Sequence, residues 1–233
     1  MRTTLLVAAC LSAVLAPFTA ASPAMAQDYG EGPTTYYLRA PSSYQEGCWG
    51  GCACPLSLGE PMRGTFTLSL ITVGDATDFY AVSGVDWTVP TLAGGGGQPF
   101  DVALAGAGTF AAGQHPFATH QHMALDLTLT PPGPWTGVQH FETTIDAGMR
   151  TVPPPLIDAE VANSTTGCPG VRLRIVATRC RADWNVDGAA TIPDIFAFVN
   201  DWLAGTPDAD FDGANGRTVG DVFAFLNSWF AGC

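Results

Sequence analysis

The chain has 233 residues and a net charge of −12, because nine arginines and no lysine stand against 21 acidic residues. Proteins that bind nucleic acid or anionic membrane surfaces need a basic face, so this balance argues against both functions. Hydrophobic residues make up 47% of the chain and charged residues only 13%, which argues against global disorder. The 27 glycines and 18 prolines favour a mainly β protein with many turns.

Residues 1–26 have the three parts of a secretory signal peptide. Arg2 supplies the positive charge, Leu5–Leu15 is an apolar run of the usual length, and Ala24-Met25-Ala26 is a cleavage site with small residues at its ends. Cys10 lies too close to the start for a lipoprotein signal, and the apolar run is too short to cross about 30 Å of hydrocarbon. We therefore predict an exported protein, extracellular or at the cell surface, with no membrane span.

Six cysteines remain after cleavage before Gln27, and an even number in an exported chain indicates disulfides. They are Cys48, Cys52, Cys54, Cys168, Cys180 and Cys233. Six cysteines allow 15 connectivities, so the sequence alone does not determine the pairing. The first four could instead form a zinc site, but Cys-x3-Cys-x-Cys is not the usual spacing. We expect disulfides, with Cys52 and Cys54 bonded to different partners, one of which is Cys168.

Residues 27–179, called the body below, show the period of two that is typical of half-buried β-strands. In the clearest segment, residues 123–129, apolar residues alternate with Ala124, Asp126 and Thr128. The alternating apolar positions of the body are Phe66, Leu68, Leu70, Tyr80, Val82, Val85, Trp87, Val89, Met123, Leu125, Leu127, Leu129, Val171, Leu173 and Ile175. Ser83-Gly84 shifts the alternation by one residue, as a bulge or a turn would. Because turn residues separate these segments, we predict a β-sandwich or a small barrel.

Three parts of the body resemble an uncharacterised domain in exported proteins of planctomycetes and related bacteria. They are GCWGGCACP from Gly47, GTFTLSLI from Gly64 and DFYAVSGVDWTV from Asp78. The resemblance implies a β-rich secreted domain and says nothing about chemistry.

The body contains no complete catalytic motif of a common hydrolase class. His120 and His122 lie on one face of a strand and could bind zinc or copper with a third ligand. That face is opposite the apolar one of residues 123–129, so we expect both histidines to be exposed to solvent. A glycosidase would need two close carboxylates, for which Glu142 with Asp126 or Asp146 is possible but not favoured.

Residues 183–205 and 210–232 are two copies of one sequence with an offset of 27. The first copy reads DWNVDGAATIPDIFAFVNDWLAG and the second DFDGANGRTVGDVFAFLNSWFAG, with ten of 23 positions identical. Each copy is an acidic loop of 12 residues followed by an amphipathic helix. Two copies alone predict one module with pseudo-two-fold symmetry rather than a solenoid.

The first loop has oxygen ligands at the spacing that calcium requires. Side chains at positions 1, 3, 5, 9 and 12, with a backbone carbonyl at position 7, are the candidate ligands. They are Asp183, Asn185, Asp187, Thr191, Asp194 and the carbonyl of Ala189. Gly188 at position 6 permits the positive φ of a sharp turn. The loop departs from the usual pattern only in ending with Asp rather than Glu.

The second loop keeps most of these ligands. Its candidates are Asp210, Asp212, Thr218, Asp221 and the carbonyl of Gly216. Position 5 is Ala214, which has no side-chain ligand, and position 6 is Asn215, which tolerates the left-handed conformation. We therefore expect one or two calcium ions, bound more tightly in the first loop.

Each helix has apolar residues at i, i+1, i+3, i+4, i+7 and i+8, which predicts one buried stripe per helix. The stripes comprise Ile195, Phe196, Phe198, Val199, Trp202 and Leu203 in the first copy, and Val222, Phe223, Phe225, Leu226, Trp229 and Phe230 in the second. We expect the two stripes to pack against each other.

The duplicated loops, the Phe-Ala-Phe-x-Asn-x-Trp helices and the terminal Ala231-Gly232-Cys233 resemble a dockerin. More narrowly, they resemble the Gly-Cys-ended type found in exported planctomycete proteins. The resemblance covers residues 180–233, called the module below, and implies calcium and a protein partner of cohesin type or a surface-attachment system. In a symmetric helix pair the two ends of the module lie close together, so we predict a Cys180–Cys233 disulfide.

The sequence thus predicts a mainly β body joined to a small all-α module of paired half EF-hands. We expect a non-enzymatic exported protein that is anchored or assembled through this module. The alternative is a small extracellular hydrolase or carbohydrate-binding protein that carries the same module.

Overall fold

The computed structural model describes residues 29, 32–48, 59–90, 101–115, 118–130, 135, 137–143, 156–163, 170–214 and 216–233. The predicted signal peptide, residues 1–26, lies outside this part of the chain, as do Cys52, Cys54, Cys168 and Asp146.

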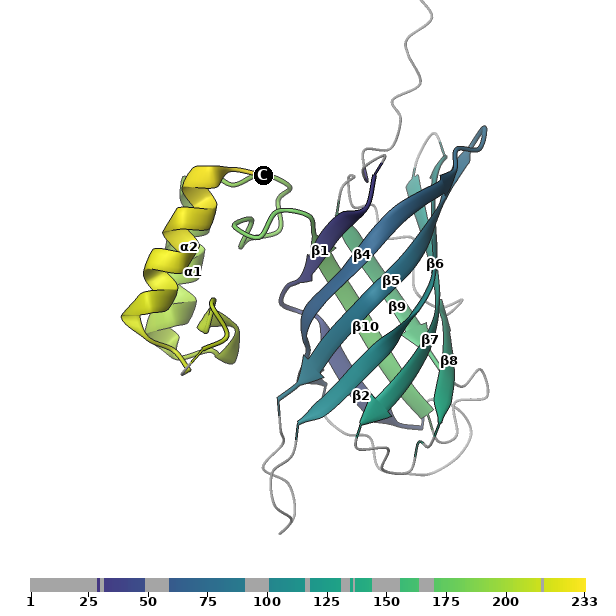
Figure 1. Ribbon diagram of the computed structural model, residues 1–233, viewed down its shortest axis with the longest axis horizontal. Helices are drawn as coiled ribbons and strands as arrows, with labels where there is room; N and C mark the ends of the chain where they lie inside the picture. Colours follow the sequence, from purple (N-terminus) through teal and green to yellow (C-terminus); the bar gives the residue numbers. More distant parts are fainter. Residues whose placement is uncertain are drawn as a thin grey trace, which may run out of the picture.

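The described residues of the body form a single antiparallel sheet of ten strands, most of which are labelled in Figure 1. The strands are β1 (Thr34–Leu38), β2 (Ser43–Gly47), β3 (Glu60–Pro61), β4 (Arg63–Thr72), β5 (Thr77–Val89), β6 (Val102–His115), β7 (Ala118–Thr130), β8 (Val138–Thr143), β9 (Ile157–Ala162) and β10 (Gly170–Thr178). Eight of them follow one another in the order β1-β4-β5-β6-β7-β8-β9-β10, and β1 pairs again with β10. The sheet is therefore closed on itself, as in the small-barrel alternative of the prediction.

Two strands share β10 as their neighbour at the closure. Leu38 of β1 is in register with Ala177, and Ser43 of β2 is in register with Arg174. Between them, Ser42 Oγ accepts a hydrogen bond from Val176 N and donates one to Val176 O, both at 2.9 Å. The chain thus follows β10 from β1 into β2, and the connection between the two strands is fixed to the sheet.

The interior of the closed sheet is one hydrophobic core that includes all the alternating positions of the prediction except Leu70, which is partly buried against it. Met123, Leu125, Leu127 and Leu129 are buried, which confirms the predicted inward face of β7. Aromatic side chains fill much of the remaining space, and Trp87 and Phe66 meet edge to face at 5.8 Å. The predicted bulge is present as well, because the register of β5 against β6 shifts between Val82 and Val85.

The module has a second, separate core built around its two helices, α1 (Ile192–Ala204) and α2 (Val219–Ala231), which Figure 1 shows beside the closed sheet. The short 3₁₀ helix η1 (Pro207–Ala209) precedes the second loop. Phe198 and Phe225, which the offset of 27 makes equivalent, stack in the centre with ring centroids 4.2 Å apart. The predicted disulfide between Cys180 and Cys233 is confirmed.

The helix pair is more exposed than the sequence predicts. Phe196 is 66% exposed and Phe223 63%, and Leu203 and Phe230 are exposed as well. The prediction that these four residues pack between the helices is wrong. The apolar arc of each helix is broad, and a helix with a single neighbour buries only the side of the arc nearest that neighbour, here centred on Phe198 and Phe225.

No helix in the described part of the chain is long and apolar enough to cross a membrane.

Candidate metal centre

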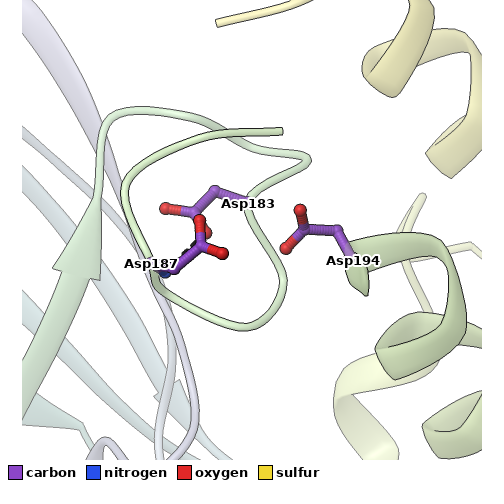
Figure 2. Close-up of side chains that lie close together, drawn as sticks. All are labelled: Asp183, Asp187 and Asp194. Carbon is purple, nitrogen blue, oxygen red and sulfur yellow. Dashed lines mark hydrogen bonds between the residues drawn. The ribbon is translucent and has the colours of Figure 1, made fainter. Parts of the chain in front are cut away.

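The first loop brings three carboxylates together (Figure 2). Asp183 and Asp187 come from the loop and Asp194 from the first turn of α1, and one oxygen of each lies within 4.8 Å of the others. Asp183 and Asp194 are fully buried, whereas Asp187 is exposed. The predicted ligands at positions 1, 5 and 12 therefore converge on one point.

Asp194 closes the loop by accepting backbone hydrogen bonds from both of its ends. Its Oδ1 accepts from Trp184 N at 2.7 Å and from Asn185 N at 2.9 Å. Its Oδ2 accepts from Thr191 N at 2.7 Å, which is half of a capping box at the start of α1. One carboxylate thus fixes the loop to the helix and forms one side of the candidate site.

Asp183 is held from the other side. Its Oδ1 accepts from Asp187 N and its Oδ2 from Gly188 N, both at 3.0 Å. Thr178, the last residue of β10, also donates to Oδ2 at 3.0 Å. Burial raises the pKa of the Asp183 carboxyl, these donors oppose the rise, and the negative charge of Asp194 adds to it. A bound cation would relieve both the burial cost and the repulsion.

The other predicted ligands of the first loop support its shape. Asn185 Nδ2 donates to Asp187 Oδ2 at 2.9 Å, and Asn185 Oδ1 accepts from Asp187 N at 3.0 Å. Ala189 N donates to Asp187 Oδ1 at 3.1 Å, and Thr191 Oγ1 donates to Asp194 Oδ2 at 3.1 Å. Gly188 has a φ of 96°, as the prediction for position 6 requires.

The second loop repeats the arrangement with Asp210, Asp212 and Asp221. Asp221 is buried, which works against its ionisation, but hydrogen bonds from Thr218, Asp212 and Phe211 outweigh the burial and hold its pKa below the ordinary value. Oδ1 of Asp210 is shielded from solvent and accepts no hydrogen bond from the described residues. An unpaired buried carboxylate oxygen is costly, and a cation would satisfy it.

Position 4 of both loops is a feature that the sequence reasoning missed. Val186 has a φ of 60°, and its equivalent Gly213 has a φ of 71°. The two loops therefore follow the same path although their residues differ at this position. Gly213 could have indicated the positive φ at position 4, because a glycine at a fixed loop position often adopts one. Gly216 also has a positive φ, while Asn215 lies outside the described residues.

Among the described residues, no ion pair neutralises the carboxylates of the two loops. None of the six carboxylates forms an ion pair with an arginine or histidine of the described residues. Like charges about 4 Å apart repel by about 1 kcal/mol in water and about 4 kcal/mol near a protein surface. The donor set consists of oxygens alone, which suits a hard divalent cation such as calcium.

The body offers no comparable cluster in its described part. His120 and His122 are exposed, as predicted from the alternation. Pairing of β7 with β8 brings His140 to 2.8 Å from Asp126 and His122 to 3.5 Å from Glu142, contacts between strands that the sequence did not indicate. Glu142 and Asp126, two of the three carboxylates considered for a glycosidase, are exposed on the outer face of the sheet.

Of the four cysteines of the body, only Cys48 lies in the described part, and it is disulfide-bonded. The predicted pairing of Cys52, Cys54 and Cys168 lies outside that part. Comparison of the chain with protein-family models, curated proteins and solved structures found no match.

Proposed function

We propose that the module is a calcium-dependent docking module of dockerin type, which attaches the body of an exported protein to a cohesin-like or surface-anchoring protein. The observation that carries the proposal is the convergence of three carboxylates in each of two equivalent loops, with no ion-pair partner among the described residues. Calcium is the ion proposed because it takes six to eight hard oxygen ligands from a flexible loop.

The first loop would hold calcium through the side chains of Asp183, Asn185, Asp187 and Asp194, and the second through Asp210, Asp212 and Asp221. Calcium supplies positive charge that offsets the repulsion among these carboxylates, so its binding contributes to the stability of the module. The loops differ at position 5, where Asp187 has no counterpart because the second loop carries Ala214. The first loop is therefore the tighter site.

The outer faces of the helices support the docking role. Each helix exposes three apolar side chains at equivalent positions: Ile192, Phe196 and Leu203 on α1, and Val219, Phe223 and Phe230 on α2. At 3.6 residues per turn, the three positions of each helix fall within an arc of about 40°. Exposed apolar side chains grouped in this way are typical of a protein-binding surface. The partner we propose is a cohesin-like protein that covers one or both of these faces.

Exchanging the residues at position 5 tests the calcium sites. In the full chain, Asp187→Ala should lower the calcium affinity of the first loop about tenfold or more, because loss even of a group that only supports a ligand costs 10–100-fold. Ala214→Asp should raise the affinity of the second loop, because it restores the missing carboxylate. Isothermal titration calorimetry measures both changes.

Asp126→Asn is the matched control, because it removes one carboxylate from the outer surface of the body and should leave calcium binding unchanged. If the wild-type chain takes up no calcium at millimolar concentration, the proposed function is wrong. Calcium uptake that is identical in all three variants would show that the ion binds elsewhere.

A further inference from the structure

The body holds the module through two arginines. Arg39 lies in the connection between β1 and β2, and its backbone N donates to Val176 O of β10 at 2.8 Å. Its guanidinium donates to the carbonyl of Arg181 and, at 3.4 Å, to that of Asp183. These carbonyls belong to the segment that leads into the first loop and to its first ligand residue.

Arg63 contacts the corresponding segment of the second loop. It begins β4, and its guanidinium donates to the carbonyl of Pro207 at 3.1 Å. The offset of 27 makes Pro207 the equivalent of Cys180, which precedes Arg181. Each of the two body arginines therefore binds the backbone that leads into one of the two loops.

Cation–π interactions join the two parts as well. The guanidinium of Arg39 lies 5.1 Å from the ring centroid of Trp184, at position 2 of the first loop, and that of Arg181 lies 5.9 Å from the ring centroid of Tyr37 in β1. Burial and, to a smaller extent, the positive charge of Arg181 lower the pKa of Arg39 to about 10, so Arg39 remains charged at neutral pH. The contact thus combines cation–π interactions with charge-assisted hydrogen bonds.

A cleft of about 650 Å³ separates the two parts beside these contacts. Its lining includes Arg39 and Arg63 from the body, and Asp208 and Asp210 from the module. Burial raises the pKa of Asp208 above its ordinary value, and the positive charges of Arg63 and Arg39 reduce that rise. This carboxylate therefore lies in the field of both arginines. Both arginines therefore line the same cleft as two carboxylates of the module.

We propose that Arg39 and Arg63 form an intramolecular clamp that couples calcium binding in both loops to the docking of the module on the body. The inference rests on the proposed function, because it assumes that the loops bind calcium. Docking fixes the backbone segments that lead into the two loops. Thr178 of β10 also donates a hydrogen bond to the first ligand, Asp183. Linkage requires that if docking raises calcium affinity, calcium strengthens docking by the same factor.

The direction in which calcium affinity changes when the arginines are replaced distinguishes this clamp from a long-range electrostatic effect. Removing two positive charges near the loops would, through the long-range field alone, raise their affinity for a cation. Losing the clamp would lower the affinity, because the loop backbone is then no longer held in place before the ion binds. We expect Arg39→Gln with Arg63→Gln to weaken calcium binding of the full chain about tenfold.

The matched control is Arg172→Gln with Arg174→Gln, which also removes two charges. These arginines pair with Glu160 and Asp158, away from the module. Arg63→Gln alone keeps the test valid if the double variant folds poorly, and it should weaken calcium binding in the same direction by a smaller factor. Calorimetry gives the affinities, and protease cleavage near Arg179 to Arg181, with and without calcium, reports docking.

Two results would overturn parts of this picture separately. If the wild-type chain takes up no calcium, the proposed function fails and the coupling fails with it. If the wild type binds calcium but the clamp variants bind it equally or more tightly, or are cleaved no faster than the wild type, the coupling is wrong and the calcium sites stand. Weaker binding together with faster cleavage supports the clamp.

Discussion

Val186 is a strained residue at a position where its repeat partner is glycine. A β-branched side chain at a φ of 60° is rare, because the left-handed conformation costs an L-residue about 1–2 kcal/mol. Gly213 adopts the same conformation without this cost. The loop fold therefore determines the backbone at position 4 regardless of the residue that occupies it.

Exchanging the residues at position 4 should change stability in opposite directions. Val186→Gly should stabilise the module by about 0.5–1 kcal/mol, since relief of strain exceeds the entropy that glycine adds to the unfolded state. Gly213→Val should destabilise it by about 1–2 kcal/mol. Urea denaturation followed by tryptophan fluorescence measures both. A loss of stability in Val186→Gly would mean that the valine side chain makes a contact worth more than the strain.

At the residue scale, the sequence predicts contacts within a loop and misses contacts between distant segments. Asp183, Asp187 and Asp194 converge as expected, because a loop of 12 residues leaves little freedom in their placement. The donors Thr178 and Arg39 were not predicted. Arg39 is 144 residues from Asp183, and no local pattern links the two. Thr178 is near in sequence but belongs to a strand whose direction only the closed sheet determines.

At the scale of elements, the helices separate the buried from the exposed phenylalanines. Phe223 and Phe225 are two residues apart and were predicted to lie on one buried stripe. In the structure Phe225 is fully buried against Phe198, whereas Phe223 is mostly exposed. The difference follows from the rotation of about 200° between the two positions on a helix.

This contrast gives a direct test of the helix orientation. With calcium present, Phe225→Ala should destabilise the module by about 3–5 kcal/mol, the usual cost of removing a buried aromatic side chain. Phe223→Ala should change stability by no more than about 0.5 kcal/mol, as expected for an exposed site. Thermal unfolding monitored by circular dichroism distinguishes the two. Equal losses in both variants would show that the helices pack by the full predicted stripe.

The strand β6 was not predicted, because small residues occupy part of its inward side. The inward side of β6 carries Gly106 and Gly108, which have low strand propensity and hide the alternation. A Cβ at Gly106 would lie 2.0 Å from the backbone oxygen of Asp126, and one at Gly108 would lie 2.0 Å from that of Ala124. The close approach of β6 to β7 therefore requires glycine here, and the same glycines weaken the sequence signal.

At the scale of the whole molecule, closure of the sheet is a property that local periodicity cannot reveal. The alternation is the same in a sandwich and in a closed sheet, and only the pairing of β1 with β10 distinguishes them. That pairing joins residues about 140 positions apart, such as Leu38 and Ala177. The separate core of the module was easier to predict, because its halves are a repeat within 54 residues.

The whole protein should bind its partner only with calcium and only through the outer helix faces. Phe196→Ser combined with Phe223→Ser should abolish the calcium-dependent retention of the full chain on a purified cohesin-like protein, because both apolar faces lose their largest central residue. Ile71→Ser combined with Val73→Ser changes two exposed apolar residues of the body and should have no effect. Surface plasmon resonance with and without chelator measures the binding. Retention that survives the phenylalanine changes would place the partner on another surface.

The Cys180–Cys233 disulfide also limits how far the protein can extend. If the helices unfold, the 54-residue segment from Cys180 to Cys233 stays a closed ring rather than becoming a free tail. A free tail of that length would reach about 180 Å at about 3.4 Å per residue, whereas the ring reaches about half as far. A partner that stays bound to the unfolded module would therefore remain within about 90 Å of the body. If the proposed attachment exists, the disulfide would therefore keep it short even without bound metal.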